Sequence, residues 1–142
     1  MSIDVKYTIS ATATGGREGH VKTEDGAIDL KLAPPQALGG SGDGHNPEQM
    51  FAAGYAACYL GAMKFATTQD ASLAKVPDDA TVKASVGIGP RSDMGFGLTV
   101  ALEVHFPGVD AAEVQKVADA GHKICPYSHA TNGNIAVTTK VA

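Results

Sequence analysis

The sequence has no run of basic residues, and its 11 Lys and Arg are outnumbered by 15 Asp and Glu, which gives a net charge of −4. Nucleic acids and anionic membranes are bound by clustered positive charge, so we expect neither as a partner. No charged and then apolar stretch precedes Tyr7, so we expect no signal peptide and a cytoplasmic protein.

Other familiar site patterns are also missing. The glycine-rich segments 39–44 and 87–89 lack the Lys and Ser/Thr of a P-loop, so we interpret both as turns. His122 and His129 flank Cys125, but no repeated CxxC or HExxH spacing accompanies them, so we expect no metal site. Cysteine is scarce, with only Cys58 and Cys125. A pair in a reducing compartment is more often catalytic or redox-sensing than a structural staple.

What is present predicts one α+β domain over residues 1–142. The chain is 142 residues long and 44% hydrophobic, which is sufficient for a real core. Strands are expected where apolar and polar residues alternate, and a second helix where the apolar spacing is helical. Strands followed by helices indicate antiparallel sheets packed on helices. The expected strands are Ile3 to Thr12, His20 to Thr23, Ile28 to Leu32, Thr81 to Gly89, Phe96 to Phe106 and Asn134 to Val141. The strands 20–23 and 28–32 are expected to form a hairpin around the turn Glu24-Asp25-Gly26. The second helix is Asp110 to Lys123, with Asp110 as its N-cap and Glu113 in the capping-box position.

The chain is organised around a helix that begins after Asn46 and is expected to fray from Gln69. The Asn46 side chain can cap free backbone N–H groups, and Pro47 suits the first helical position. From Gln49 to Phe65 the run is apolar almost all round, with a single charge. A helix without a polar face is a buried helix, and this one is too short and too interrupted for a membrane span.

Cys58 lies in the middle of this helix, and its residue type allows two interpretations. A buried cysteine often acts as a small hydrophobic side chain. A reactive thiol must instead form a thiolate, which an apolar site disfavours. Cys58 is also several turns from the helix N-terminus, beyond the reach of the helix dipole. A reactive Cys58 would therefore need a cation, either Arg17, which the glycines on both sides can hold in a tight turn, or Arg91 in a hairpin turn.

Cys125 follows the second helix and precedes a proline. Taken alone it is another packed cysteine. A cysteine at a helix end is also well placed to move and meet a second one. Two such thiols suit redox chemistry in which one is oxidised to a sulfenic acid and the other resolves it as a disulfide.

Two segments carry a family resemblance. The run Asn46-Pro-Glu-Gln-Met-Phe-Ala-Ala-Gly-Tyr-Ala-Ala-Cys58, together with Cys125-Pro-Tyr-Ser-His-Ala-Thr131, closely resembles the organic hydroperoxide resistance (Ohr) branch of the Ohr/OsmC family. Segments 15–20, 38–42 and 133–135 also fit. The Cys-Pro-Tyr-Ser segment points to the Ohr branch rather than to the OsmC branch.

The resemblance implies a thiol-dependent peroxidase in an intertwined α+β homodimer with two active sites at the subunit interface. It implies that Cys58 is the peroxidatic cysteine and Cys125 the resolving one, and that Arg17 and Glu48 tune the site. The implied substrates are organic hydroperoxides, including those of fatty acids. No bound cofactor is implied. The implied reductant is an external lipoyl dithiol, either dihydrolipoamide or a lipoylated protein.

Helix geometry adds a constraint to that assignment. Glu48 and Cys58 are ten positions apart, about 15 Å on a straight helix. They can share a site only if Arg17 spans the gap, the helix bends, or the partner chain supplies Glu48, and we expect the last. The nonpolar residues near the motif suggest an apolar substrate lining, for which we name Met50, Phe51 and Phe96.

Two other functions remain open. In a non-catalytic thiol sensor, oxidation of Cys58 and Cys125 would alter binding to a partner and would occur once, without turnover. In a structural protein with inert cysteines, thiol reactivity would be ordinary and Arg17→Ala would have no effect.

Overall fold

The computed structural model describes residues 1–142, which form two compact units, Met1–Gln49 and Met50–Ala142. The expected α+β class is confirmed, since each unit contains a three-stranded sheet and helices accompany them. Whether the chain behaves as a single domain stays a prediction.

The unit Met1–Gln49 contains an antiparallel sheet of order β1-β2-β3. The predicted hairpin is confirmed, but the predicted strand from Ile3 to Thr12 is largely wrong, because only its last two residues lie in a strand. The apolar side chains of residues 3, 5, 7 and 9 are exposed, so no strand of this chain pairs with that segment. The elements of this unit are β1 (Ala11–Thr14), η1 (Gly16–Glu18), β2 (His20–Thr23), β3 (Asp29–Lys31) and η2 (Gln36–Leu38).

The central helix is confirmed as α1, Pro47–Gln69. Its start is a capping box, in which the Asn46 side chain accepts from the Gln49 backbone N–H and the Gln49 side chain accepts from the Asn46 N–H, both at 2.9 Å. Pro47 at the first helical position has no backbone N–H, so it leaves no donor unpaired there. No helix of the chain combines the length and the hydropathy that crossing a bilayer requires.

The sheet of the second unit contains β4 (Thr81–Pro90), β5 (Phe96–His105) and β6 (Val137–Val141). Strands β4 and β5 form a long antiparallel hairpin with Thr81 opposite His105. Strand β6 pairs with β5 in parallel, so the expectation of purely antiparallel sheets is wrong for this one. A parallel neighbour requires a crossover connection, and α2 and α3 supply it.

The crossover consists of α2 (Ala111–Ile124) and the short α3 (Pro126–Thr131). The Asp110 cap is confirmed, because its carboxylate accepts from the Ala112 N–H. The capping box predicted with Glu113 does not form, since that carboxylate accepts from Lys116 instead. Helix α3 was not expected, because six residues are too few for an apolar periodicity to show.

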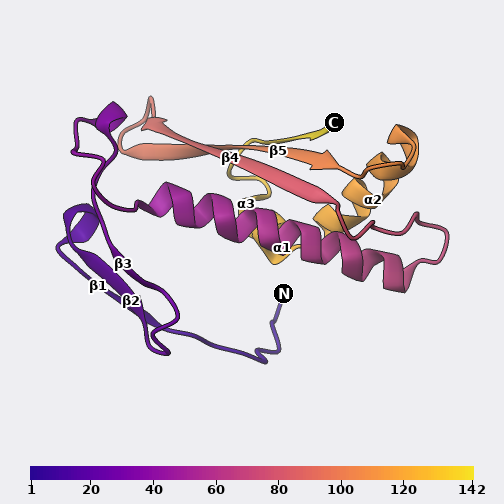
Figure 1. Cartoon of the computed structure of the whole chain (residues 1–142), viewed down its shortest axis with the longest axis horizontal. Helices are drawn as coiled ribbons and strands as arrows, with labels where there is room; N and C mark the ends of the chain where they lie inside the picture. The colour runs from indigo at the N-terminus through magenta and orange to yellow at the C-terminus, as the bar shows by residue number, and fades with distance from the viewer. The chain divides into compact units, whose positions relative to one another are not determined.

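Figure 1 shows α1 and α2 along one side of the β4–β5–β6 sheet. The core lies between these layers. Along the second half of β5, buried side chains that face the core alternate with exposed side chains on the other face. The sheet covers only one side of α1, so the expectation of a helix buried all round is met on that side alone. The buried members of the core are Tyr55, Tyr59, Ala62, Met63, Val100, Leu102, Val104, Phe106, Val114, Val117, Ala118 and Cys125.

Candidate active site: a cysteine pair and an arginine–glutamate pair

The two cysteines lie side by side in the unit Met50–Ala142. Both are free thiols, and the S–H of Cys125 points at Cys58 Sγ across 3.6 Å. A disulfide has an S–S distance of about 2.05 Å, so a small movement would join the two sulfurs. Cys58 is partly exposed whereas Cys125 is 1% exposed, so a reactant from solvent meets Cys58 first.

Cys125 sits at the corner between α2 and α3. Its backbone is extended (φ −64°, ψ 120°), as expected for a residue before proline. Its thiol caps α3 by accepting from the Ser128 N–H at 3.4 Å, and its own N–H bonds to the Gly121 carbonyl. The backbone therefore directs the Cys125 sulfur back toward α1.

The surroundings of Cys58 disfavour its thiolate. Burial is the largest influence and raises the pKa of Cys58; the Tyr127 backbone N–H acts in the opposite direction, and the neighbouring Cys125 adds to the increase. A thiolate needs a lower pKa than these groups provide, so the reactive form requires an added positive charge.

Arg17 and Glu48 form a bidentate ion pair in the unit Met1–Gln49. The Arg17 nitrogens donate to the two carboxylate oxygens at 2.7 and 2.9 Å, the geometry in which guanidinium and carboxylate bind most strongly. The hydrogen bond from Arg17 is the main reason that the pKa of Glu48 lies below its ordinary value. The two residues belong to the same chain. Whether Glu48 serves the Cys58 of its own chain or of a partner stays a prediction, and α1 runs without interruption through both positions.

The turn that carries Arg17 depends on glycine. Gly15 and Gly16 have φ angles of +71° and +59°, which side-chain-bearing residues rarely adopt. Between β1 and β2 they form the short helix η1 from which Arg17 projects. The sequence expectation that glycines hold this arginine in a tight turn is confirmed.

Three aromatic rings gather next to the cysteines. Phe51, Tyr55 and Tyr127 make mutual edge or tilted contacts with ring centroids 5.6 to 6.2 Å apart. Tyr127 lies against α1 at Gly54, where a Cβ atom would come within 2.7 Å of its hydroxyl oxygen. Gly54 is one turn before Cys58, so the absence of a side chain there lets Tyr127 approach the sulfur pair.

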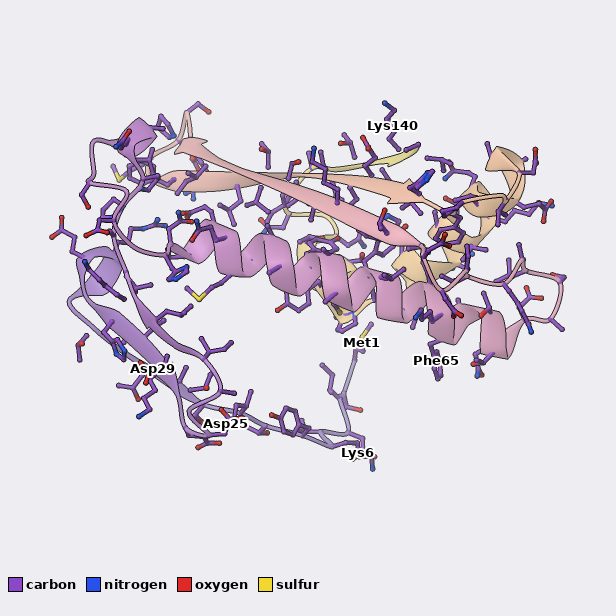
Figure 2. The ribbon with its side chains drawn as sticks, in the orientation of Figure 1. Met1, Lys6, Asp25, Asp29, Phe65 and Lys140 are labelled. Atoms are coloured by element: carbon purple, nitrogen blue, oxygen red, sulfur yellow. The ribbon has the colours of Figure 1, made fainter.

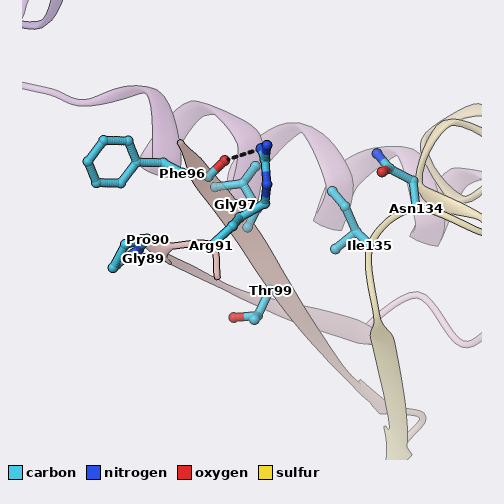
Figure 3. A pocket seen from close by; sticks show the side chains of 9 residues that line it. Gly89, Pro90, Arg91, Phe96, Gly97, Thr99, Asn134 and Ile135 are labelled. Atoms are coloured by element: carbon cyan, nitrogen blue, oxygen red, sulfur yellow. Dashed lines mark hydrogen bonds between the residues drawn. The ribbon is translucent and has the colours of Figure 1, made fainter. Parts of the chain in front are cut away.

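The structure does not bring together the three residues that were expected to bind substrate. Phe51 belongs to the aromatic group, and Met50 is partly buried beside it on α1. Phe96 is 69% exposed and lines a different pocket, of about 480 Å³, at the β4–β5 hairpin (Figure 3), whose lining includes neither cysteine. Substrate contact by all three stays a prediction.

The competing cation, Arg91, belongs to that hairpin pocket. Its guanidinium donates to the Asp93 carboxylate and to the Phe96 carbonyl oxygen (Figure 3), which folds the side chain across the turn. Both bonds hold Arg91 within its own hairpin, so of the two arginines Arg17 is the better candidate for the cysteine chemistry.

His122, which lies near Cys125, is engaged with hydroxyl groups. Both ring nitrogens of His122 are bonded to hydroxyl groups, those of Ser128 at 2.8 Å and Thr139 at 2.7 Å. No three His, Cys, Asp or Glu side chains are grouped so that they could hold a metal ion. Sequence reasoning missed Ser128 and Tyr127 as neighbours of the sulfurs. The sequence signal that could have found them is Cys125 followed by Pro126, because proline is common at the first position of a helix and so predicts α3.

The chain is similar to known proteins over most of its length. The OsmC-like protein family profile matches residues 40–140. An organic hydroperoxide resistance protein of Xanthomonas axonopodis pv. citri is 53% identical over 139 residues, covering 97% of this chain and 96% of that protein. The crystal structure of an organic hydroperoxide resistance protein from Elizabethkingia anophelis superposes with a TM-score of 0.90 at 43% identity, covering 99% of both chains.

A third relative is less similar in sequence but has the same fold. The crystal structure of the organic hydroperoxide resistance protein OhrB of Bacillus subtilis gives a TM-score of 0.84 at 37% identity, with 96% of this chain and 98% of that chain covered. Sequence and fold agree over nearly the whole length, and the chain belongs to the Ohr branch of the Ohr/OsmC family.

Proposed function

We propose that this chain is a thiol-dependent peroxidase that reduces organic hydroperoxides, including those of fatty acids, to alcohols. The observation that carries the proposal is the 3.6 Å separation of one partly exposed and one buried thiol. The relatives named organic hydroperoxide resistance proteins support a role in organic hydroperoxide detoxification.

In the first step, the Cys58 thiolate attacks the terminal oxygen of the hydroperoxide. An S–O bond forms as the O–O bond breaks, and the departing alkoxide takes a proton from solvent to give the alcohol. Cys58 becomes a sulfenic acid, and the hydroperoxide gains the two electrons that the sulfur loses.

In the second step, the Cys125 sulfur attacks the Cys58 sulfenic sulfur. The S–S bond forms as the S–O bond breaks, and the hydroxide leaves as water with the thiol proton of Cys125. An external lipoyl dithiol then reduces the disulfide by thiol–disulfide exchange and becomes a lipoyl disulfide. The two free thiols are restored, so the cycle needs no bound cofactor.

Arg17 supplies the positive charge that this chemistry requires. It lowers the pKa of the Cys58 thiol, against the effect of burial, and stabilises negative charge on the reacting oxygens. Glu48 fixes the guanidinium through its two hydrogen bonds. This role belongs to the proposal, as does the expectation that Glu48 comes from the partner chain.

An apolar surface near Cys58 favours organic over inorganic peroxide. Phe51 and Tyr127 contact each other there, and an alkyl or acyl chain gains by burying its surface against them, whereas hydrogen peroxide has no apolar surface to bury. Met50 extends the proposed lining, whereas Phe96 lies apart at the β4–β5 hairpin, so its contact with substrate stays a separate prediction.

A homodimer is part of the proposal. Ala53, Ala57, Gly61 and Phe65 are all exposed and spaced four residues apart, which forms one continuous ridge on α1. Figure 2 shows Phe65 projecting from α1 on the side away from β4 and β5. Ridges of small residues allow close packing of a second helix, and a second copy would bury this one. Sedimentation should therefore give twice the chain mass of 14.5 kDa.

Steady-state turnover tests the function. Reduced protein is mixed with dihydrolipoamide and either cumene hydroperoxide or hydrogen peroxide, and peroxide loss is followed. Multiple turnovers with a clear preference for cumene hydroperoxide support the peroxidase. One oxidation per chain without turnover favours the non-catalytic sensor. If neither cysteine is oxidised, both have a purely structural role.

A further inference from the structure

A chain of hydroxyl groups lies behind the cysteine pair. The Ser128 hydroxyl bonds to His122 Nδ1 at 2.8 Å and to the Tyr55 hydroxyl at 3.0 Å. The Tyr55 hydroxyl also bonds to Thr131 at 3.2 Å, and His122 Nε2 bonds to Thr139 on β6 at 2.7 Å. We call these five side chains the hydroxyl–imidazole network.

The network touches each helix that carries or flanks a sulfur. Tyr55 is three residues before Cys58 on α1, while His122 is three residues before Cys125 and Ser128 three residues after it. The Ser128 N–H also donates to Cys125 Sγ. One hydroxyl group therefore connects α1, α2 and α3 at the point where the two sulfurs face each other.

Burial makes these bonds consequential. Tyr55 is fully buried, and Ser128 and Thr131 are 7% and 4% exposed, so hydrogen bonds among them are stronger than they would be in bulk water. Burial also lowers the pKa of His122, partly opposed by Asp119, so its ring is neutral at pH 7. A neutral imidazole offers one donor and one acceptor, so the two hydroxyls it bonds must have opposite roles.

We infer that His122, Ser128 and Tyr55 are positioning residues for disulfide closure, because they hold the Cys125 sulfur within reach of Cys58. The inference rests on the proposed function and concerns its second step alone. In that step the Cys125 sulfur attacks the Cys58 sulfenic sulfur, the S–O bond breaks, and water leaves with the Cys125 proton. The first oxidation does not use the Cys125 thiol, so it should be independent of the network.

The test is a matched pair of substitutions at one position. In His122→Asn the side-chain amide can replace Nδ1 and bond to Ser128, whereas in His122→Gln it can replace only Nε2 and bond to Thr139. Both variants lose the stacking of His122 on Tyr59, so their stabilities should fall together. Thr139→Val is the control that removes only the bond to β6, and Tyr55→Phe removes only the hydroxyl on α1.

Single-turnover oxidation by one equivalent of cumene hydroperoxide separates the two steps. Sulfenic acid is trapped with a dimedone-type probe, and disulfide is counted by mass at successive quench times. Disulfide closure should slow about tenfold or more in His122→Gln and Tyr55→Phe, since small misplacements of reacting atoms are costly. The first oxidation should change by less than about twofold, and His122→Asn and Thr139→Val should close like the unmodified chain.

Equal closure rates in all five chains would overturn the inference, as would slowing in the Asn and Gln variants alike. Closure driven by diamide is measured in parallel, because it needs the same approach of Cys125 to an adduct on Cys58 but no peroxide. If cumene hydroperoxide oxidises none of the chains, the proposed function fails, and the diamide rates still decide the positioning roles. If His122→Gln does not fold, Tyr55→Phe decides them.

Discussion

The two halves of the proposed machinery lie in regions of very different character. The cysteine pair belongs to Met50–Ala142, where Cys125 is part of a core shared by two helices and a sheet. The arginine–glutamate pair belongs to Met1–Gln49, where the Arg17 side chain is 44% exposed on a glycine-rich turn. Packing thus fixes the distance between the sulfurs, whereas in the proposed function one ion pair governs the charge. Changes in the first region should decide whether the reaction occurs, and changes in the second its rate and pH dependence.

The largest effect should come from Cys58→Ser. A hydroxyl group is a far weaker nucleophile than a thiolate, so peroxide turnover should fall by about a thousandfold or more. Steady-state peroxide consumption measures this loss, and circular dichroism verifies that the fold is kept. Retained turnover in a folded Cys58→Ser chain would show that another residue carries out the reaction.

Cys125→Ser should separate the two steps. Cys58 should still be oxidised once, and the sulfenic acid should then persist or proceed to sulfinic acid, because no thiol resolves it. Intact mass after a single peroxide addition would show one or two added oxygen atoms. Sustained lipoyl-dependent turnover by this variant would refute the resolving role of Cys125.

Arg17→Ala should slow the first oxidation at pH 7 by about ten- to a hundredfold, because only the Tyr127 backbone N–H then opposes the effect of burial, which raises the pKa of Cys58. A smaller fraction of thiolate is present at pH 7, so the rate should keep rising at higher pH than in the unmodified chain. Stopped-flow oxidation across pH measures both effects. Arg91→Ala is the matched control, and an equal loss in that variant would point to general destabilisation rather than to a charge at the site.

The smallest effect should come from Glu48→Gln. The pKa of Glu48 is lowered by its hydrogen bond from Arg17, so the ion pair stabilises the fold above the unfolded carboxyl pKa of about 4.3 and this contribution is lost as the pH falls. A partly exposed pair contributes less than about 1 kcal/mol to the free energy of unfolding. Urea unfolding of both chains should show a small difference near pH 7 that closes in acid. A difference that grows in acid would contradict the assignment.

The sequence predicted the elements whose signals are local. The start of α1 was predictable because Asn46 and Pro47 act through adjacent backbone groups, and its end at Gln69 is confirmed. The β2–β3 hairpin followed from its turn residues in the same way. Alternation between Ile3 and Ile9 shows that a segment suits a sheet, but it does not tell which strand is available to pair. The parallel direction of β6 was likewise hidden, because alternation is the same in either direction.

The candidate site was predictable to a different degree. The identities of Cys58, Cys125, Arg17 and Glu48 came from the family resemblance, since neither cysteine has a local feature that proves reactivity. The contacts of Tyr127 with Gly54 and of Ser128 with His122 depend on how α3 packs on α1 and α2. Side chains that meet only through tertiary packing leave no periodic signal in the sequence.

The most direct test of the account is the fate of the two thiols after one equivalent of cumene hydroperoxide. Intact mass and non-reducing peptide mapping are read on the same sample, and cumyl alcohol is measured beside them. The account predicts a chain lighter by two hydrogen atoms, with Cys58 joined to Cys125 and one alcohol formed per disulfide. A chain that carries added oxygen while Cys125 stays free, or one that remains fully reduced, would contradict it.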